Sequence, residues 1–285
     1  MIRSISPLRY PGGKKNLTNF LASVLKINKI NNGIYVEPFA GGAGAALNLM
    51  VLEHVHNIVI NDADYNVYCF WMAVLNDTGA FAKRIQSVRV TVNTWKKQKK
   101  ILDNTQNYDQ FDVGFATFFL NRCNRSGILN AGPIGGFDQS GPFKIDARFN
   151  KKELSERVEE IAYYRDRIKV YNLDAIDLLK MFSNSKRCLI YIDPPYFVGG
   201  KKLYLNYYKS DDHCNLSQFI QSELFPPWVL SYDNVPEISA LYSERKSLTY
   251  DLRYSANIAK TGKEIMFFSD NLSIPQIETK FRGRC

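Results

Sequence analysis

Apolar residues recur along most of the chain in two patterns, one with the spacing of an amphipathic helix and one of short continuous runs. The first pattern begins at Leu17 and continues at Phe20, Leu21, Val24 and Leu25. Positions i, i+3, i+4, i+7 and i+8 share one face of a helix, so this spacing predicts an amphipathic helix that starts near Leu17.

The continuous runs are rich in β-branched and aromatic residues and predict seven strands. They lie at Ile34–Val36, Ile58–Asn61, Ile168–Tyr171, Cys188–Ile192, Trp228–Ser231, Ser247–Tyr250 and Glu264–Ser269. Helical patterns separate most of these runs, at residues 43–50, 65–75, 175–182, 213–224 and 236–242. This alternation is typical of an α/β fold with a mainly parallel, doubly wound sheet. The last two runs have no clear helix between them, so we expect them to pair antiparallel at one end of the sheet.

One interval departs from this rhythm. About 100 residues separate the second and third runs, whereas βα and αβ loops usually have about 2 to 6 residues. We therefore predict a core formed by residues 1–75 and 168–285 and an inserted, mainly helical subdomain at residues 76–167. The insertion contains the aromatic run FATFFLNR at residues 115–122 and a loop rich in glycine and proline at residues 127–142.

The distribution of charge indicates what kind of partner the protein binds. The 285 residues carry a formal net charge of +9, and a basic surface is expected of a protein that handles a polyphosphate. Residues 76–167 supply +5 of this charge, and residues 80–102 hold seven basic side chains and no acidic one, among them Lys96, Lys97, Lys99 and Lys100. The segment is either a solvated helix face or a nucleic-acid contact, and its unneutralised charge favours the contact.

Cysteine usage and hydropathy exclude several classes of protein. The five cysteines are scattered and never form a CxxC pair, which argues against a disulfide framework and against a zinc site. We find no apolar run of about 18 residues and no basic-then-apolar leader, so the sequence predicts neither a membrane span nor a secretory signal. We therefore expect a globular, cytoplasmic protein with no metal and no membrane partner.

The segment RYPGGK, residues 9–14, directly precedes the first predicted helix. Free N–H groups and the helix dipole attract anions at such an end, glycine permits close backbone approach, and Lys14 adds a positive charge. A plain glycine turn before a surface helix is the simpler interpretation of these six residues alone.

Two motifs follow the first and second predicted strands, where ligands of doubly wound sheets bind. EPFAGGAG at residues 37–44 is a glycine turn that leads into a helix, and NDAD at residues 61–64 follows the next strand. In NDAD, Asp62 stands where a carboxylate would bind the ribose hydroxyls of a nucleoside-containing cofactor. The spacing does not fit the dinucleotide GxGxxG pattern. Asp62 could instead cap the following helix, and Asp64 could exchange roles with it.

A third motif, DPPY at residues 193–196, follows the apolar run CLIYI. Pro194 and Pro195 lack N–H donors and stiffen the turn, so its backbone offers carbonyl acceptors without competing donors. Asp193 adds an acceptor carboxylate and Tyr196 adds a flat ring. This set suits a planar group that bears an NH2, held by two accepted hydrogen bonds and by stacking, such as the exocyclic amine of adenine.

Taken in order, the motifs RYPGGK, EPFAGGAG, NDAD, FFLNR with SGIL, and DPPY resemble those of the Dam-type family of DNA adenine methyltransferases. The resemblance continues through KLYLNYY, DDH, LSYDN and GKEIMFFSDN and covers nearly the whole chain. It implies a seven-stranded, Rossmann-like methyltransferase sheet with S-adenosylmethionine as the methyl donor. It also implies methyl transfer to the N6 amine of an adenine flipped out of double-stranded DNA, with the insertion as the target-recognition subdomain.

The same resemblance implies roles for individual residues. The candidate cofactor contacts are Tyr10, Pro11, Lys14, Glu37, Phe39, Gly41, Asp62 and Asp193, with Asp174 a weaker candidate for the adenine end of the cofactor. The candidate catalytic residues are Asp193, Pro194, Pro195 and Tyr196. In these roles, Asp193 and the Pro194 carbonyl accept hydrogen bonds from the amine, and Tyr196 stacks on the base. No metal is implied.

Beside the four lysines, the resemblance implies DNA contacts after the LNR match, at Arg122, Asn124, Arg125 and Asn130. Arg125 and Ser126 depart from the family pattern, because relatives often carry an aromatic residue next to asparagine-glycine there, and this leaves the recognition sequence open. We expect a monomer. The alternatives are an RNA adenine methyltransferase and a catalytically silent nucleic-acid-binding protein, and the intact DPPY and glycine turn argue against the second.

Overall fold

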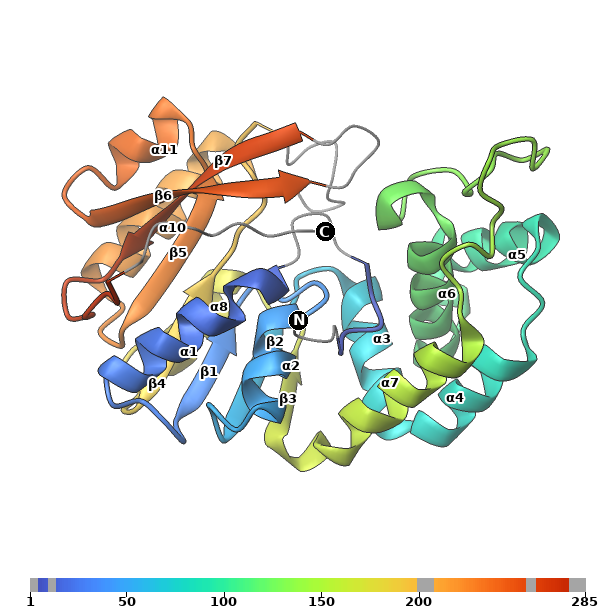
Figure 1. Cartoon of the computed structure of the whole chain (residues 1–285), viewed down its shortest axis with the longest axis horizontal. Helices are drawn as coiled ribbons and strands as arrows, with labels where there is room; N and C mark the ends of the chain where they lie inside the picture. The colour runs from blue at the N-terminus through green and yellow to red at the C-terminus, as the bar shows by residue number, and fades with distance from the viewer. Residues whose placement is uncertain (1–4, 10–13, 199–207, 255–259, 277–285) are drawn as a thin grey trace. The chain divides into compact units, whose positions relative to one another are not determined.

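The computed structural model describes residues 5–9, 14–198, 208–254 and 260–276, and these residues form two compact units (Figure 1). Residues 5–9 and 64–166 belong to a helical unit. Residues 14–63 and the described residues from 167 onward belong to a sheet unit.

Within its described residues, the sheet unit has seven strands in the order β3-β2-β1-β4-β5-β7-β6. Their bounds are β1 Ile34–Glu37, β2 Asn57–Asn61, β3 Ile168–Tyr171, β4 Cys188–Ile192, β5 Trp228–Asp233, β6 Lys246–Tyr254 and β7 Lys260–Phe268. The first five strands are parallel, and β7 pairs antiparallel with both β5 and β6. All seven predicted strands are confirmed, as is the antiparallel pairing of the last two. Because β7 lies between β5 and β6, the sixth strand forms the edge.

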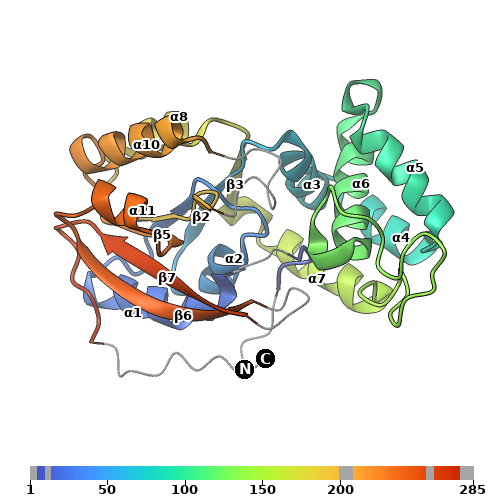
Figure 2. The same ribbon diagram turned by 90° about the horizontal axis from the view of Figure 1, so that it is seen from above.

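Helices cover both faces of this sheet, as a doubly wound fold requires (Figure 2). Helices α1 (Thr18–Ile27) and α2 (Gly44–Val51) lie on one side, and α8 (Ala175–Phe182), α10 (Ser210–Ser222) and α11 (Pro236–Leu241) lie on the other. Alternate strand residues such as Val36, Ile190 and Leu230 form the core with Leu178 of α8 and Leu216 of α10. The intervening residues therefore point toward the face that α1 covers.

A short 3-10 turn, η1 (Lys14–Leu17), leads into α1. The buried side chains Phe20, Leu21, Val24 and Leu25 confirm the predicted apolar face of this helix. The ring of Phe20 meets Phe268 of β7 edge to face, with 6.2 Å between the ring centroids. This packing holds the beginning of α1, and with it Lys14, against the sheet.

The helical unit consists of α3 (Tyr65–Asn76), α4 (Thr78–Ser87), α5 (Val92–Leu102), α6 (Gln110–Cys123) and α7 (Lys151–Tyr163), with short 3-10 turns at 105–107 and 125–127. Capping side chains mark several helix starts: Asp64, Thr91, Asp109 and Asn150 each accept a hydrogen bond from an amide in the first turn.

Helix α6 forms the centre of this unit and packs against α3 and α5. Its aromatic run is buried, and Phe118 stacks on Phe70 of α3 with 6.2 Å between the ring centroids. A Cβ at Gly114 would come within 2.4 Å of the Cys69 carbonyl oxygen, so glycine is what allows α6 to approach α3 this closely. Because α3 packs on α6, the unit begins at Asp64, whereas the sequence places the boundary at residue 76.

Candidate active site

The strand order reverses at the neighbouring strands β1 and β4. At such a switch point the connections leave in opposite directions and open a crevice beyond the carboxyl ends of the strands, where ligands bind. Glu37 is the last residue of β1, and Asp193 directly follows β4. The topology thus brings EPFAGGAG and DPPY to the same edge of the sheet, as their positions after strands predict.

The glycine turn after β1 is held by the carboxylate that follows β2. Gly41 and Ala43 have positive φ values of 46° and 47°. The Gly41 N–H donates to Asp62 Oδ2 over 2.9 Å, and the Ala46 N–H donates to Glu37 Oε1 over 3.1 Å. Turn and carboxylate therefore form one cradle in which Asp62 is only partly buried.

The structure distinguishes the roles of Asp62 and Asp64, which the sequence left interchangeable. Asp64 caps α3, because its Oδ1 accepts from the Asn66 N–H over 2.9 Å. Asp62 instead faces the glycine turn. Between the strands, the buried Asn61 donates to the carbonyls of Pro38 and Leu173 over 2.9 and 3.0 Å, which ties together the loops after β1 and β3.

Two further cofactor candidates lie at the same edge. Asp174 follows β3, is exposed, and caps α8 by accepting from the Ile176 N–H over 2.8 Å. Phe39 is half-buried, and its ring meets Tyr208 edge to face at 5.5 Å between centroids. Tyr10 and Pro11 lie outside the described residues, so their predicted contacts with the cofactor stay predictions.

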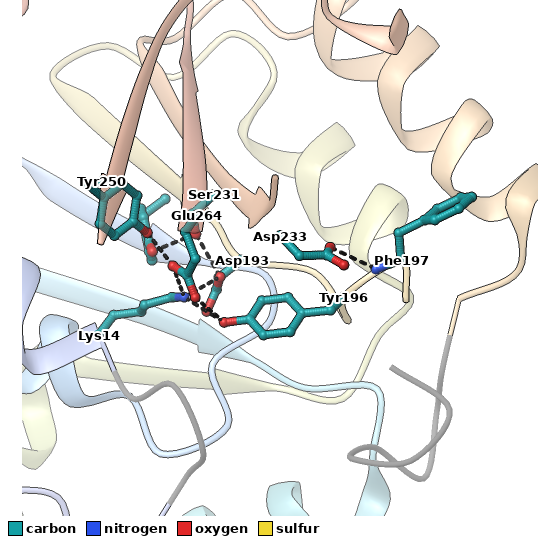
Figure 3. A network of polar contacts seen from close by, with 9 residues as sticks. Lys14, Asp193, Tyr196, Phe197, Ser231, Asp233, Tyr250 and Glu264 are labelled. Atoms are coloured by element: carbon teal, nitrogen blue, oxygen red, sulfur yellow. Dashed lines mark hydrogen bonds and ion pairs between the residues drawn. The ribbon is translucent and has the colours of Figure 1, made fainter. Parts of the chain in front are cut away.

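Lys14 lies between two carboxylates at the centre of the site (Figure 3). Its Nζ is 3.2 Å from Asp193 Oδ1 and 3.0 Å from Glu264 Oε2. The Lys14 side chain is 6% exposed, Glu264 is fully buried, and Asp193 keeps 22% of its surface exposed. The sequence suggested that Lys14 binds an external anion. In the structure its ammonium instead binds two carboxylates of the protein itself.

Burial and these charges shift the acid and base strengths in the site. Burial alone would lower the pKa of Lys14, but the adjacent Asp193 and Glu264 carboxylates outweigh it and raise that pKa. The pKa of Asp193 is raised by burial and by the charge of Glu264, and the Lys14 ammonium and the Ser231 hydroxyl oppose the rise. Burial also raises the pKa of Glu37 to about 8.

Within the described part of the chain, Glu264 accepts hydrogen bonds from three side chains. The hydroxyl of Tyr196 donates to its Oε1, and the hydroxyl of Tyr250 and the Lys14 ammonium donate to its Oε2. Tyr250 lies directly across from Glu264 in the β6–β7 pairing, so the two side chains share a face of the sheet. Lys14 also donates to the Tyr196 hydroxyl over 3.1 Å. The ring of the DPPY tyrosine is therefore held at its hydroxyl end.

The DPPY turn is held from β5 as well. The Ser231 hydroxyl donates to Asp193 Oδ1 over 2.6 Å. Beyond the two buried prolines, Asp233 accepts from the Phe197 and Val198 N–H groups over 2.9 and 3.0 Å. Figure 3 shows both supports on either side of the turn. Asp193 is consequently fixed at its carboxylate, and the chain is fixed again just after Tyr196.

Sequence reasoning missed Glu264, Ser231, Asp233 and Tyr250 as parts of the site. The only signal was indirect, because LSYDN and GKEIMFFSDN belong to the family resemblance without a role for any single residue. A glutamate near a strand end is most often exposed. Its burial here depends on Lys14, which lies 250 positions earlier in the chain.

The residues predicted to contact DNA all lie in the helical unit, but they differ in how exposed their side chains are. Lys96, Lys97 and Lys100 are exposed on α5, whereas Lys99 is partly buried and pairs with Asp103 at 2.8 Å. Arg125 and Asn130 are exposed on the loop after α6. Arg122 is half-buried and donates from Nε to the Arg148 carbonyl over 2.7 Å. Roles in DNA binding stay predictions for these residues.

Asn124 differs from the other predicted DNA contacts because its side chain is buried, and its role in DNA binding stays a prediction. This residue has no exposed surface. Its Oδ1 accepts from the Trp95 indole N–H over 2.5 Å, and its Nδ2 donates to the carbonyls of Ile128 and Leu129 over 2.8 and 3.0 Å. Asn124 therefore shapes the loop that follows α6.

Fold and site together define an α/β protein of the doubly wound, Rossmann-like class with its ligand site at the switch point of the sheet. Residues 10–256 match the model of one protein family, and the chain belongs to that family, the D12 class N6 adenine-specific DNA methyltransferases. This membership confirms the resemblance seen in the motifs. It supports methyl transfer to adenine and the use of S-adenosylmethionine.

Two solved structures show a distant likeness. A candidate RNA methyltransferase from Pyrococcus horikoshii is 12% identical to this chain, with a TM-score of 0.42. The superposition covers 92% of this chain and 85% of the other. The rRNA methyltransferase aviRa from Streptomyces viridochromogenes is 11% identical, with a TM-score of 0.33. That superposition covers 87% of this chain and 82% of the other. No match is found among curated proteins. Among the described residues, no helix is long and apolar enough to cross a membrane, and no cluster of His, Cys, Asp and Glu could hold a metal ion.

Proposed function

We propose that the protein transfers a methyl group from S-adenosylmethionine to the N6 amine of an adenine flipped out of double-stranded DNA. The observation that carries this proposal is the DPPY turn. Asp193 retains exposed surface at the switch point while Lys14 and Ser231 fix its carboxylate. An acceptor held in this way can receive a hydrogen bond from a planar amine without reorganising, which is the main source of electrostatic catalysis.

The residues present fit the cofactor. Gly41 and Ala43 turn the backbone into a cradle, the partly exposed Asp62 carboxylate suits ribose hydroxyls, and Phe39 offers a ring at the same strand edge. When bound, S-adenosylmethionine supplies a methyl group on a positively charged sulfur. Among the described residues, Glu37, Phe39, Gly41 and Asp62 would hold it, with Asp174 at the end of β3 as the weaker candidate.

The reaction itself requires the chain to orient a weak nucleophile. The lone pair of the adenine amine is delocalised into the ring. Two accepted hydrogen bonds, to Asp193 and to the Pro194 carbonyl, favour a more pyramidal nitrogen with a directed lone pair. Pro194 and Pro195 offer no N–H that could compete for these acceptors. The methylated nitrogen is strongly acidic and loses its proton after the transfer, so Asp193 does not have to act as a base beforehand.

The base has to leave the duplex before it reaches Asp193, at a cost of a few kcal/mol. In this proposal Tyr196 stacks on the flipped base, and such stacking is worth about 1 to 3 kcal/mol per base. The hydrogen bonds from Tyr196 to Glu264 and from Lys14 to Tyr196 would hold the ring in place. Exposed lysines of α5 and the residues Arg122, Arg125 and Asn130 would supply phosphate or base contacts.

The test is transfer of labelled methyl groups from S-adenosylmethionine to unmethylated genomic DNA and, in parallel, to total RNA. We expect labelled N6-methyladenine in DNA within one short sequence context. Asp193→Ala should lower the rate at least about 100-fold, whereas Asp211→Ala, at an exposed aspartate of α10, should not change it. Label in RNA alone would support the RNA alternative, and an unchanged rate in Asp193→Ala would refute the assigned role.

A further inference from the structure

We propose that Tyr191 and Ser231, the hydroxyl pair, are positioning residues that anchor Oδ1 of Asp193 and leave its Oδ2 to accept the hydrogen bond from the target amine. This inference rests on the proposed function and deepens it. The Tyr191 hydroxyl oxygen lies 2.7 Å from Ser231 Oγ. The Ser231 hydroxyl in turn donates to Asp193 Oδ1 over 2.6 Å.

The pairing of two central strands brings these three side chains together. In the parallel register of β4 and β5, Ile192 lies beside Leu230, and Asp193 and Ser231 are the next residues along the chain. Residues two positions apart on a strand point to the same face of the sheet, so Tyr191 shares a face with Asp193. The strand register thus leads both hydroxyls to the carboxylate of the DPPY turn.

The direction of the two hydrogen bonds follows from the number of protons. A hydroxyl has one proton to donate, and an ionised carboxylate can only accept, so the Ser231 proton is committed to Asp193. The hydrogen bond between the two hydroxyls must then be donated by Tyr191. Burial and the charge of Asp193 raise the pKa of Tyr191 well above its usual value, so Tyr191 keeps its proton and remains a donor.

Packing alone does not require either hydroxyl. Tyr191 and Ser231 are buried, and their neighbours on the same face, Leu189 and Val229, are buried and apolar. Phenylalanine and alanine would suit such a face without any polar atom that needs a partner. The hydroxyl pair is therefore explained by the carboxylate to which it leads.

The contacts of Asp193 distinguish its two carboxylate oxygens. Lys14 Nζ lies 3.2 Å from Oδ1, the oxygen that also accepts from Ser231, and Figure 3 shows both contacts. Within the described residues, neither of these donors forms its contact with Oδ2. Two donors at Oδ1 hold the carboxylate against rotation, and Asp193 keeps 22% of its surface exposed. The remaining oxygen can therefore meet the amine without reorganisation.

The hydroxyl pair also affects the acid strength of Asp193. The Ser231 hydroxyl and the Lys14 ammonium both oppose the rise in the pKa of Asp193 that burial and Glu264 cause. Removing the Ser231 donor should therefore raise that pKa further, because a hydrogen bond to the charged form favours that form. The other titratable groups around Asp193 are Lys14 of η1, Tyr35 and Glu37 of β1, Tyr232 of β5, Tyr250 of β6 and Glu264 of β7.

The experiment follows the titration of Asp193 by NMR in protein with isotope-labelled aspartate, with Asp193→Asn to assign the signal, and measures methyl transfer to DNA over the same pH range. In Ser231→Ala, the titration and the acid limb of kcat should both move to higher pH. Its kcat at neutral pH should fall about tenfold, the loss expected for one hydrogen bond to a charged group, with little change in the KM for S-adenosylmethionine.

Two further variants separate the hydroxyl pair from general effects on the core. Tyr191→Phe keeps the Ser231 donor but removes the group that polarises it, so both curves should move in the same direction by a smaller amount. Tyr232→Phe is the matched control. It removes a buried hydroxyl of β5 that contacts His213 Nδ1 over 2.8 Å, and it should leave both curves in place.

Unchanged curves in Ser231→Ala would overturn the inference, as would an equal shift in Tyr232→Phe, which would indicate a merely structural cause. If Ser231→Ala does not fold, Tyr191→Phe must still move both curves to higher pH. A wild-type protein that methylates neither DNA nor RNA would refute the proposed function, and with it the role of the hydroxyl pair in the reaction. An active wild type whose curves stay unchanged in Ser231→Ala and Tyr191→Phe would refute only the hydroxyl pair.

Discussion

Replacing Lys14 by methionine should destabilise the sheet unit strongly and in a way that depends on pH. The substitution removes an ammonium that is 6% exposed and that lies between the carboxylates of Asp193 and Glu264. Removing one partner of a buried ion pair costs about 3 to 5 kcal/mol. The raised pKa of Lys14 means that its stabilising contribution is complete below the unfolded pKa of 10.5 and is lost only as the pH rises through the folded value.

Urea unfolding of the wild type and Lys14→Met at pH 7.5 and pH 5 measures this effect. The loss should be smaller at pH 5, because Asp193, whose pKa Lys14 holds down, can then take up a proton in the variant. Adding Glu264→Gln removes one of the two carboxylate charges that Lys14 contacts and should recover at least half of the loss at pH 7.5. Lys180→Met removes an exposed lysine that pairs with Asp177 and should leave the stability unchanged.

Two outcomes would refute this reasoning. A loss below about 1 kcal/mol would mean that the carboxylates do not depend on Lys14, since surface substitutions alone reach about 0.5 kcal/mol. A double variant as unstable as the sum of its two single variants would mean that charge repulsion is not the cause, because residues in contact should couple by about 0.5 to 3 kcal/mol.

Three further predictions concern other parts of the chain. The raised pKa of Glu37, about 8 against 4.5, predicts that its contribution to stability falls by about 1.4 kcal/mol per pH unit between pH 4.5 and 8. Glu37→Gln should abolish that part of the slope in denaturant unfolding at several pH values, and an identical slope would contradict it. Changing Lys96, Lys97 and Lys100 together to glutamine should reduce the slope of log affinity for DNA against log salt by up to about 2.7, whereas the matched change at the exposed Lys26, Lys29 and Lys186 of the sheet unit should not. Asn124→Ala removes the acceptor of the Trp95 indole N–H and the donor to the Ile128 and Leu129 carbonyls, of which Ile128 still accepts from the Ala131 N–H, and should cost about 2 to 4 kcal/mol; thermal unfolding near the wild-type value would show that these contacts do not hold the loop.

Local patterns were sufficient for the sheet. The run CLIYI is a strand because five consecutive apolar residues suit a position buried on both faces, and β4 is central in the sheet. The same local reading placed Asp62 and Asp193 at strand ends. Knowing that ligands bind there was enough to nominate them without knowing the order of the strands.

Long-range contacts explain what sequence reasoning missed. Nothing near Asn124 indicates that the indole of Trp95, 29 positions earlier, donates to its side chain and that the residue is buried. The helix at residues 65–75 is predicted, but the boundary at residue 76 assigns it to the core, whereas α3 packs on α6 in the helical unit. Gly114 allows this close packing on a helix that lies 38 or more positions earlier. Such pairings follow from the packing of the whole unit and leave no local trace in the chain.

The arrangement around Lys14 is not explained by stability. Desolvating two carboxylates and an ammonium is costly, and apolar residues of similar volume often stabilise a protein more than a buried ion pair does. The charges are confined to one place, because the neighbouring strand residues Leu189, Val229, Met266 and Phe268 are buried and apolar, as in an ordinary core. Natural sequences break such local rules mainly at functional sites. Lys14, Asp193 and Glu264 lie beside the DPPY turn, where the sheet opens its ligand crevice. These three charged groups are therefore better understood as part of ligand binding than as part of holding the fold together.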